Sequence, residues 1–278
     1  MDLLKKVSGI IKKVSNDVIM PNFYNLRRDP SFRENAAEVV TQADIESERH
    51  LIHELSKIIP NSLVVSEEWS KNYPYISTCF EDRNVKNLWV IDPLDGTQNF
   101  INKSENFAVA VTLMERGHPV AAWIYLPYKK QMLYGDEVHG VFLNDQKLNF
   151  SNQVSKIKKM DANGALAPYV GKSVKLMRAH SCSCSYFNLI TQKTDAVVFS
   201  KKLLPWDHTA GAFLHKCSGG FNAFIDGTRY TPARDGVNTL ILAPNKRLWM
   251  ELRGKTRSWL QQMEQENDII KQFKGRRR

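Results

Sequence analysis

Two aspartates on either side of a proline are the residues of this sequence whose spacing most clearly suggests chemistry. Asp92 and Asp95 lie three positions apart around Pro93, directly after the apolar run from Leu88 to Ile91. The apolar run predicts a strand covered on both faces, and a proline prevents a regular continuation of its hydrogen-bond ladder. The chain is therefore expected to turn here. Two carboxylates this close can converge on one hard cation or on two neighbouring ones.

The two residues after this aspartate pair add a candidate site for a phosphate. Gly96 lets the backbone approach a ligand, and a helix is expected to begin at Thr97. The N–H groups at such a helix start bind anions, so those of Gly96 and Thr97 are candidates for holding phosphate oxygens. Taken alone, an Asp-x-x-Asp-Gly segment also fits a plain turn with capping carboxylates.

The same segment argues against a covalent phosphoenzyme. The signature Asp-x-Asp-Gly-Thr places a nucleophilic aspartate two residues before a second, acid/base aspartate. The position it needs for the nucleophile is occupied by Pro93. The covalent mechanism of that signature therefore lacks its spacing in this sequence.

The whole chain has the composition of a globular protein. Its 278 residues, 42% of them hydrophobic, can bury one large core or two closely joined lobes. No apolar run approaches the roughly 20 residues that span a bilayer, and the first 18 residues have the spacing of an amphipathic docking helix. Four cysteines without a Cys-x-x-Cys pair and no visible secretory signal predict reduced thiols and a cytoplasmic location.

The charge of the chain favours anionic partners. The formal net charge is +10, with lysine clusters and a basic C-terminal end. Binding to nucleic acid would need basic residues interleaved with exposed aromatics, and the sequence shows no such pattern. A nucleic-acid partner is therefore open but unsupported, and a membrane partner is not expected.

Further acidic residues lie near the expected ends of buried elements. A helix is expected from a capping box at Thr41 and Asp44 to residue 59, with a capping role as the plain interpretation of Asp44. A short strand at 63–65 runs into Glu67 and Glu68, one of which is a candidate metal ligand. The polar stretch 70–87 is expected to be a mobile excursion.

The remaining pattern divides the chain near residue 150. An antiparallel meander is expected over 107–148, a polar boundary over 149–161, and alternating strands and helices beyond it. This gives a lobe of residues 1–150 and a second lobe of residues 151–278. Other expected elements are a loop at 21–38, strands near 165, up to 178, and at 196–199, 221–225 and 239–242, and helices at 183–191, 205–218 and 248–263.

Three segments in this order resemble the inositol monophosphatase family. They are Ser66-Glu67-Glu68, Asp92-Pro93-Leu94-Asp95-Gly96-Thr97 and Trp206-Asp207-His208-Thr209-Ala210-Gly211, preceded by Val40-Thr41-Gln42-Ala43-Asp44. The resemblance implies an α+β fold, a layered αβαβα sandwich, and a magnesium-dependent, lithium-sensitive phosphomonoesterase that forms a homodimer.

The resemblance also implies which residues hold the metal. Glu67, Asp92 and the carbonyl of Leu94 are expected to bind one Mg²⁺. Asp92, Asp95 and Asp207 are expected to bind a second, and a third ion near Glu67 is usual in such sites. The ions make physical sense because a phosphate dianion would otherwise be repelled by the carboxylates.

The expected reaction is in-line attack of an activated water on phosphorus. Glu67 and the hydroxyl of Thr97, itself held by Asp44, are expected to help remove the proton of a metal-bound water. The backbone N–H groups of Gly96 and Thr97 would hold phosphate oxygens.

Departures from the family pattern lie on the substrate side. The inositol enzymes have small residues shortly after an arginine at the place of Arg178, and an acid seven positions before the last metal aspartate. Here that acid is replaced by Ser200, followed by Lys201 and Lys202. The change weakens the case for inositol phosphate and favours a substrate with a second anionic group.

Three interpretations follow for the function. The first is a phosphatase for a small monoester such as inositol monophosphate, a sugar phosphate or histidinol phosphate. The second is a 3′(2′),5′-bisphosphate nucleotidase or sugar bisphosphatase of the same superfamily. The third is an RNA- or protein-binding factor with a vestigial phosphatase site, for which the net charge of +10 is the motive.

Overall fold

The first half of the chain forms a seven-stranded sheet in sequence order. In this computed structural model, which describes residues 1–28, 36–70, 77–162, 164–234 and 236–275, β1 and β2 are parallel and all later neighbours are antiparallel. The antiparallel meander predicted from the sequence is therefore confirmed. The strands are β1 (Leu63–Ser66), β2 (Asn87–Asp95), β3 (Ala108–Glu115), β4 (His118–Leu126), β5 (Gln131–Asp136), β6 (Gly140–Leu143) and β7 (Gln146–Lys147).

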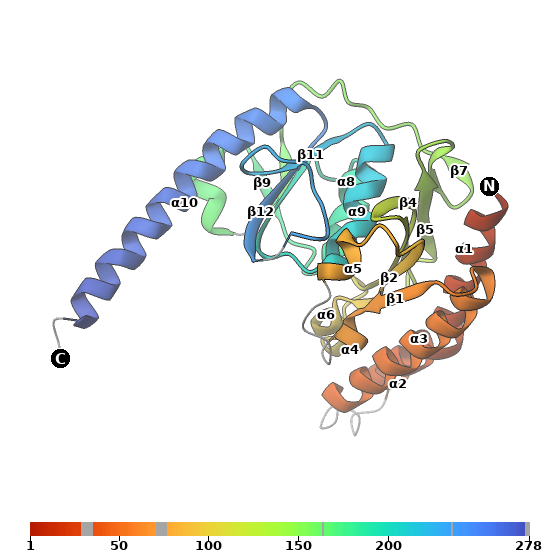
Figure 1. Ribbon diagram of the computed structural model, residues 1–278. Coiled ribbons are helices and arrows are strands. Elements are labelled where there is room, and N and C mark those ends of the chain that lie inside the picture. The colour runs from red at the N-terminus through yellow and green to blue at the C-terminus, as the bar shows by residue number, and fades with distance from the viewer. Residues whose placement is uncertain (29–35, 71–76, 163, 235, 276–278) are drawn as a thin grey trace.

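Long helices cover one face of this sheet (Figure 1). Helix α1 (Asp2–Val14) continues through a π-helical turn (Ser15–Ile19) into α2 (Met20–Arg28), and α3 (Ala36–Ile58) packs beside them. The docking of α1 is confirmed: Leu4 is buried, and its carbonyl accepts a hydrogen bond of 3.0 Å from the indole of Trp123 on β4.

Two predictions about this helical layer are wrong. The stretch 21–38 was expected to be a loop, but α2 runs to Arg28, and 29–35 lies outside the described residues. Helix α3 begins at Ala36 rather than at a capping box, so Asp44 lies two turns inside it. The apolar residues of α1, the π turn and α2 form one continuous stripe that packs against the first sheet. This packing stabilises helix beyond the point where polar residues in the sequence suggested a loop.

The second half forms a five-stranded sheet with the order β11-β12-β10-β8-β9. Strand β8 is parallel to β9 and β10, whereas β12 is antiparallel to β10 and β11. The strands are β8 (Lys159–Asp161), β9 (Lys175–Met177), β10 (Ala196–Lys202), β11 (Phe221–Phe224) and β12 (Val237–Ala243).

Helices α8 (Cys182–Ile190) and α9 (Pro205–Cys217) lie between the two sheets. Strand β3 shows how the layers are built: Val109 and Val111 face the α1–α3 layer, while Ala108 and Ala110 face α8 and α9. Helix α10 (Lys246–Gly275) and the short α7 (Ala167–Val170) cover the outer face of the second sheet. The result is the αβαβα sandwich that the resemblance implied.

The sequence pattern fails in the shortest elements of the second half. The strand expected near residue 165 is a 3₁₀ helix (Gly164–Leu166), and β8 falls inside the stretch expected to be a polar boundary. Strand β8 has only three residues and is held by backbone pairing with a strand on each side. A strand this short shows no alternation of apolar and polar residues in the sequence.

In the first half of the chain, the stretch 70–87 contains α5 (Ser77–Glu81), and its part from 71 to 76 lies outside the described residues.

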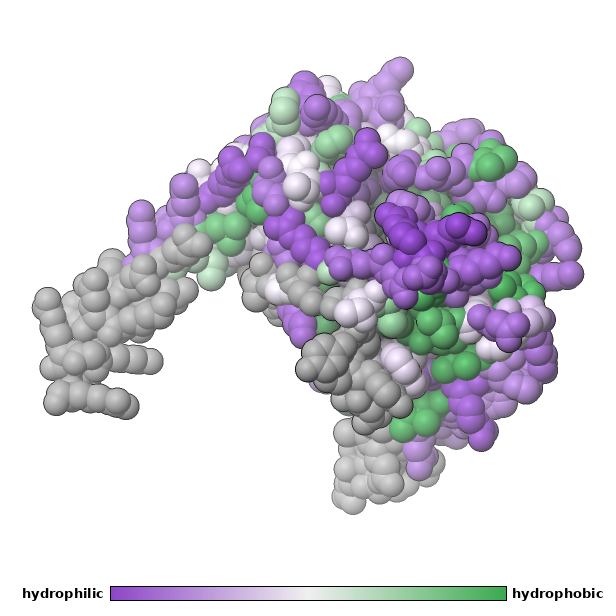
Figure 2. All heavy atoms as spheres, viewed as in Figure 1, coloured by the Kyte–Doolittle hydropathy of each residue, from purple (hydrophilic) through white to green (hydrophobic). Residues whose placement is uncertain are grey.

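The last helix is longer than predicted. Helix α10 packs on the second sheet through Leu248, Trp249, Leu252 and Trp259 and then extends away from the body (Figure 1). Hydrophilic side chains dominate the face shown in Figure 2, with apolar ones in small groups. Among the described residues, every helix is too short or too polar to cross a bilayer.

Candidate active site

Strand β2 carries both aspartates of the central segment, and Pro93 disrupts its pairing as predicted. The pairing with β3 is regular up to Asp92 and shifts between Asp92 and Asp95. Asp92 is 1% exposed; its Oδ1 accepts a hydrogen bond of 3.1 Å from the N–H of Leu94. Its Oδ2 is buried and has no hydrogen-bond partner among the described residues. A buried anionic oxygen without a donor is suited to a cation.

Gly96 makes the turn that follows. Its φ of +94° lies in the left-handed region, and an added Cβ would lie 2.9 Å from the carbonyl oxygen of Asn106 and 3.0 Å from Cβ of Ser181. A side chain has no room there, so glycine is required. Helix α6 (Thr97–Ile101) then begins as predicted, and the Thr97 hydroxyl donates to the carbonyl of Leu94 at 3.2 Å. The expected link from Thr97 to Asp44 stays a prediction.

Asp95 joins the first sheet to helix α8. Its Oδ1 accepts from the N–H of Cys182 at 3.2 Å, and its Oδ2 accepts from the N–H of Ser183. These N–H groups belong to the first turn of α8, which Ser181 caps through a bond of 3.1 Å from the N–H of Cys184. Burial raises the pKa of Asp95, and the hydrogen bonds from Ser183 oppose that rise.

Five carboxylates from four elements converge around Asp92. Burial raises the pKa of Asp92 well above its usual range, and the negative charges of Asp95, Glu67, Asp207 and Asp44 raise it further. Burial also raises the pKa of Asp207 to about 8, with Asp95 and Glu67 adding to the effect. The structure therefore brings together the carboxylates singled out in the sequence, from α3, α4 (Glu67–Ser70), β2 and α9.

Such a cluster fits hard divalent cations. Oxygen is the only donor type in it, and without cations several buried carboxylates would repel one another or take up protons. Leu94 lies between the two aspartates in the sequence of β2, and its carbonyl is a candidate for a neutral oxygen ligand. The residues present thus match the donor set that Mg²⁺ prefers.

The structure also shows two positioning residues that the sequence analysis missed. Glu48 on α3 is 8% exposed, and its Oε2 accepts the N–H of Glu68 at 3.0 Å, which fixes the start of α4 beside Glu67. Its spacing of four from Asp44 places both on one face of α3 and was the available signal. The amide of Asn99 donates to the carbonyls of Ala179 (3.0 Å) and His180 (3.2 Å). Nothing in the sequence pointed to Asn99.

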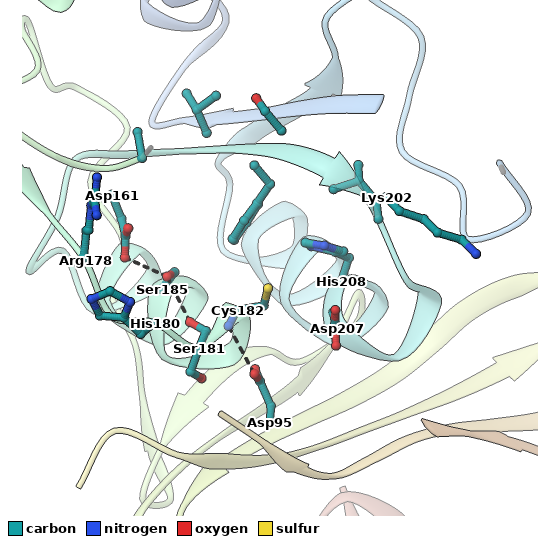
Figure 3. A pocket seen from close by; sticks show the side chains of 15 residues that line it. Asp95, Asp161, Arg178, His180, Ser181, Cys182, Ser185, Lys202, Asp207 and His208 are labelled. Atoms are coloured by element: carbon teal, nitrogen blue, oxygen red, sulfur yellow. Dashed lines mark hydrogen bonds between the residues drawn. The ribbon is translucent and has the colours of Figure 1, made fainter. Parts of the chain in front are cut away.

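A pocket of about 430 Å³ opens beside the carboxylates. Figure 3 shows Asp95, Asp207 and His208 on one side, and Asp161, Arg178 and His180 on the other. Arg178 and Ser200 therefore line the same pocket, as expected for substrate-side residues. The Ser200 hydroxyl is 3.3 Å from that of Thr239 on β12, which donates to it.

Asp161 is the acidic residue of this pocket that the sequence analysis overlooked. Its Oδ2 accepts from the N–H of Ala179 at 3.1 Å and from the hydroxyl of Ser185 at 2.7 Å. Burial raises its pKa, while the hydrogen bond from Ser185 opposes the rise. Asp161 is the last residue of the three-residue β8. The sequence analysis had assigned it to the polar boundary at 149–161 and not to a strand that leads into the pocket.

His208 lies beside Asp207 but is almost fully buried, at 2% exposure. Burial lowers its pKa to about 3, so the ring is neutral. The Tyr186 hydroxyl lies 3.1 Å from Nδ1 and fixes the ring. All four cysteines are free, and Cys182 lines the pocket at the start of α8.

Comparison with known proteins places this site in a family. Residues 2–262 match the family model described as "Inositol monophosphatase family", and the chain belongs to this family, whose members are phosphatases. The resemblance noted in the sequence is thereby confirmed.

The individual relatives carry the names of different phosphatases. The chain is 26% identical over 197 residues to a fructose-1,6-bisphosphatase/inositol-1-monophosphatase of Thermotoga maritima, covering 68% of this chain and 73% of the relative. It is 37% identical over 125 residues to the 3′(2′),5′-bisphosphate nucleotidase CysQ of Haemophilus influenzae, covering 45% and 41%.

A solved structure confirms the fold. Inositol monophosphatase II from Staphylococcus aureus MSSA476 superimposes with a TM-score of 0.75 at 21% identity, covering 91% of this chain and 94% of that one.

Proposed function

We propose that this chain is a Mg²⁺-dependent phosphatase that hydrolyses a small phosphate monoester without forming a phosphoenzyme. The observation that carries the proposal is the convergence of Asp44, Glu67, Asp92, Asp95 and Asp207 next to the glycine turn at residue 96. Buried carboxylates in such number repel a phosphate dianion unless cations neutralise them.

The proposed metal ligands are those expected from the sequence. Glu67, Asp92 and the carbonyl of Leu94 would hold one Mg²⁺; Asp92, Asp95 and Asp207 would hold a second, and a third would lie near Glu67. When bound, the ions neutralise the carboxylates and lower the pKa of water, which supplies a nucleophile at neutral pH. The buried, unbonded Oδ2 of Asp92 supports this assignment.

The chain's own groups orient the reactants and move the proton. The N–H groups of Gly96 and Thr97 hold phosphate oxygens in line for attack. Gly96 supports this role because its left-handed turn, in which a side chain would meet Asn106 and Ser181, leads directly into the start of α6. Glu67, with the hydroxyl of Thr97, accepts the proton of the attacking water. Asp44 acts through Thr97 as a positioning residue.

The substrate side favours a monoester that carries a further polar or anionic group. Position 200 offers a serine hydroxyl already bonded to Thr239, while Arg178, His180 and Lys202 line the same pocket. Asp161 supplies an acceptor for a substrate hydroxyl on that wall. A 3′(2′),5′-bisphosphate nucleotidase or sugar bisphosphatase activity is thus the second candidate, and the local 37% identity to a bisphosphate nucleotidase supports it.

The test is phosphate release from one monoester and two bisphosphates, with and without Mg²⁺. Inositol monophosphate, fructose 1,6-bisphosphate and adenosine 3′,5′-bisphosphate form the panel, and added Li⁺ should inhibit. Release that requires Mg²⁺ supports the chemistry, and the preferred compound identifies the substrate class. Absence of release from every compound, with Mg²⁺ binding intact, would refute the proposal.

A further inference from the structure

Three side chains with different donor atoms meet where helices α8 and α9 approach each other. One ligand atom each from Cys182, Asp207 and His208 lie within 4.8 Å of one another. Cys182 is the first residue of α8, and the other two are consecutive in the first turn of α9. Figure 3 shows the sulfur of Cys182 between the two helices. Within the described ranges, these residues form the single such group of histidine, cysteine and carboxylate ligand atoms.

This donor set differs from the carboxylate cluster beside it. Mg²⁺ prefers oxygen, whereas sulfur, imidazole nitrogen and carboxylate oxygen together suit Zn²⁺ and similar thiophilic cations. Zinc lies about 2.0–2.3 Å from such ligands, which puts neighbouring ligand atoms less than about 4 Å apart. The observed spacing is close enough for small side-chain rotations to complete a three-ligand site, with the fourth position open to the pocket.

The surroundings of these residues hold them in place. The His208 ring is 2% exposed, bonded to Tyr186, and packed edge-on against Phe199 at a centroid distance of 4.7 Å. The N–H of Cys182 is bound to Asp95, which fixes the position from which its side chain starts. A ligand whose other nitrogen or backbone is anchored in this way loses little freedom on binding a metal.

We propose that Cys182, Asp207 and His208 bind a thiophilic divalent cation of the Zn²⁺ type, and that this binding inhibits the enzyme by withdrawing Asp207 from the Mg²⁺ site. The inhibition rests on the proposed phosphatase function, whereas the binding itself does not. The thiol of Cys182 and the imidazole of His208 are donors that the carboxylate cluster lacks and that Mg²⁺ does not prefer. Excess Mg²⁺ therefore competes with Zn²⁺ only for Asp207.

The binding is tested with Zn²⁺ itself and with Co²⁺ as a spectroscopic probe. Metal-free protein is titrated with Zn²⁺ by calorimetry in excess Mg²⁺, and the Co²⁺ form is examined for thiolate-to-metal charge-transfer absorption. Cys182→Ser removes the sulfur and keeps the size of the side chain. Cys184→Ser is the matched control on the same helix, and Cys217→Ser on α9 is a second control in case the buried position 184 does not tolerate the change.

Wild type and a folded control variant should bind one Zn²⁺ and show the absorption. Cys182→Ser should lose the absorption and weaken Zn²⁺ binding by about 10-fold or more. Equal Zn²⁺ affinity in Cys182→Ser and wild type would overturn the proposed site. So would an absorption band that survives in Cys182→Ser.

The inhibition is tested separately on the Mg²⁺-loaded enzyme. Zn²⁺ should lower the rate of phosphate release in wild type and in the control variants, and a chelator should restore it. Cys182→Ser should need about 10-fold more Zn²⁺ for the same effect. Equal sensitivity of Cys182→Ser and wild type would overturn the inhibitory role, even if Zn²⁺ binds. If no variant releases phosphate, the phosphatase proposal fails, and the calorimetry still decides the metal site.

Discussion

The two sides of the active-site pocket are built in different ways. On the carboxylate side, Asp92 and Asp95 are buried, and the backbone at Gly96 leaves no room for a side chain. On the opposite side, the side chains of Arg178 and His180 are exposed. The carboxylate side is constrained by packing and by backbone geometry, so it tolerates few residue types. Apart from the buried Asp161, the polar side chains of the opposite side face solvent, so we expect sequence change there to alter the substrate before it alters the fold.

The strongest test of this difference is Asp92→Asn. We expect loss of phosphate release by at least about 100-fold, because the bridging carboxylate contributes to both proposed metal positions. The fold should remain intact, and the metal-free variant should melt at a higher temperature than wild type, since one charge leaves a repulsive buried cluster. Activity assays and thermal melts without metal measure both effects. Full activity in the variant would remove Asp92 from the site.

Gly96→Ala tests the backbone constraint on the same side. The new Cβ would lie 2.9 Å from the carbonyl oxygen of Asn106, in a residue with φ of +94°. We expect a loss of about 1–3 kcal/mol in the free energy of unfolding. The rate of phosphate release should also fall, because the turn proposed to bind the phosphate would shift. Gly171→Ala is a matched control, since its φ is +93° but its Cβ would meet nothing within 4 Å. Equal losses of unfolding free energy in Gly96→Ala and Gly171→Ala would mean that the cost comes from the left-handed backbone alone and not from contact with Asn106.

The pH dependence of stability tests the charge of the carboxylate side. Burial raises the pKa of Asp207 from 3.8 to about 8, so its protonated form is favoured in the fold. The resulting stabilisation is fully present below pH 4 and is lost as the pH rises through about 8. The melting temperature of metal-free protein should therefore fall between about pH 4 and pH 8 relative to that of Asp207→Asn. Mg²⁺ should remove this pH-dependent fall in the wild type. Parallel melting curves for the two proteins would contradict this charge assignment.

The substrate side should respond to substitution with a change of preference and a smaller change in rate. Ser200→Glu restores an acid at the position where inositol enzymes have one, so inositol monophosphate should gain relative to a bisphosphate. A hydrogen bond to a charged group is worth about 1.5–3 kcal/mol, so a shift of about 10-fold or more in the ratio of kcat/KM values is expected. Ser200→Gln, of similar size and without charge, is the control. An unchanged ratio in Ser200→Glu would place the specificity elsewhere in the pocket.

The same division explains what the sequence could predict. The carboxylate segment was readable because a buried strand, a proline and a glycine each impose one local conformation, as β2 and Gly96 confirm. Asp161 and Cys182 were not assigned to the pocket because pairing between distant strands and the docking of α8 bring them there. Helix α3 was predicted too short for a related reason, since packing on the sheet outweighs the local capping signal.

The wide spacing of the five carboxylates along the chain has a consequence for how the protein folds. They extend from residue 44 on α3 to residue 207 on α9, and the helices that carry them lie on opposite faces of the first sheet. Contacts of such long sequence separation form late in folding, because the chain must first lose the entropy of closing a large loop. During refolding, helical signal and burial of the tryptophans should therefore precede the recovery of catalysis. Catalytic competence in this chain is a property of the docked halves and appears only when α9 has seated against the first sheet.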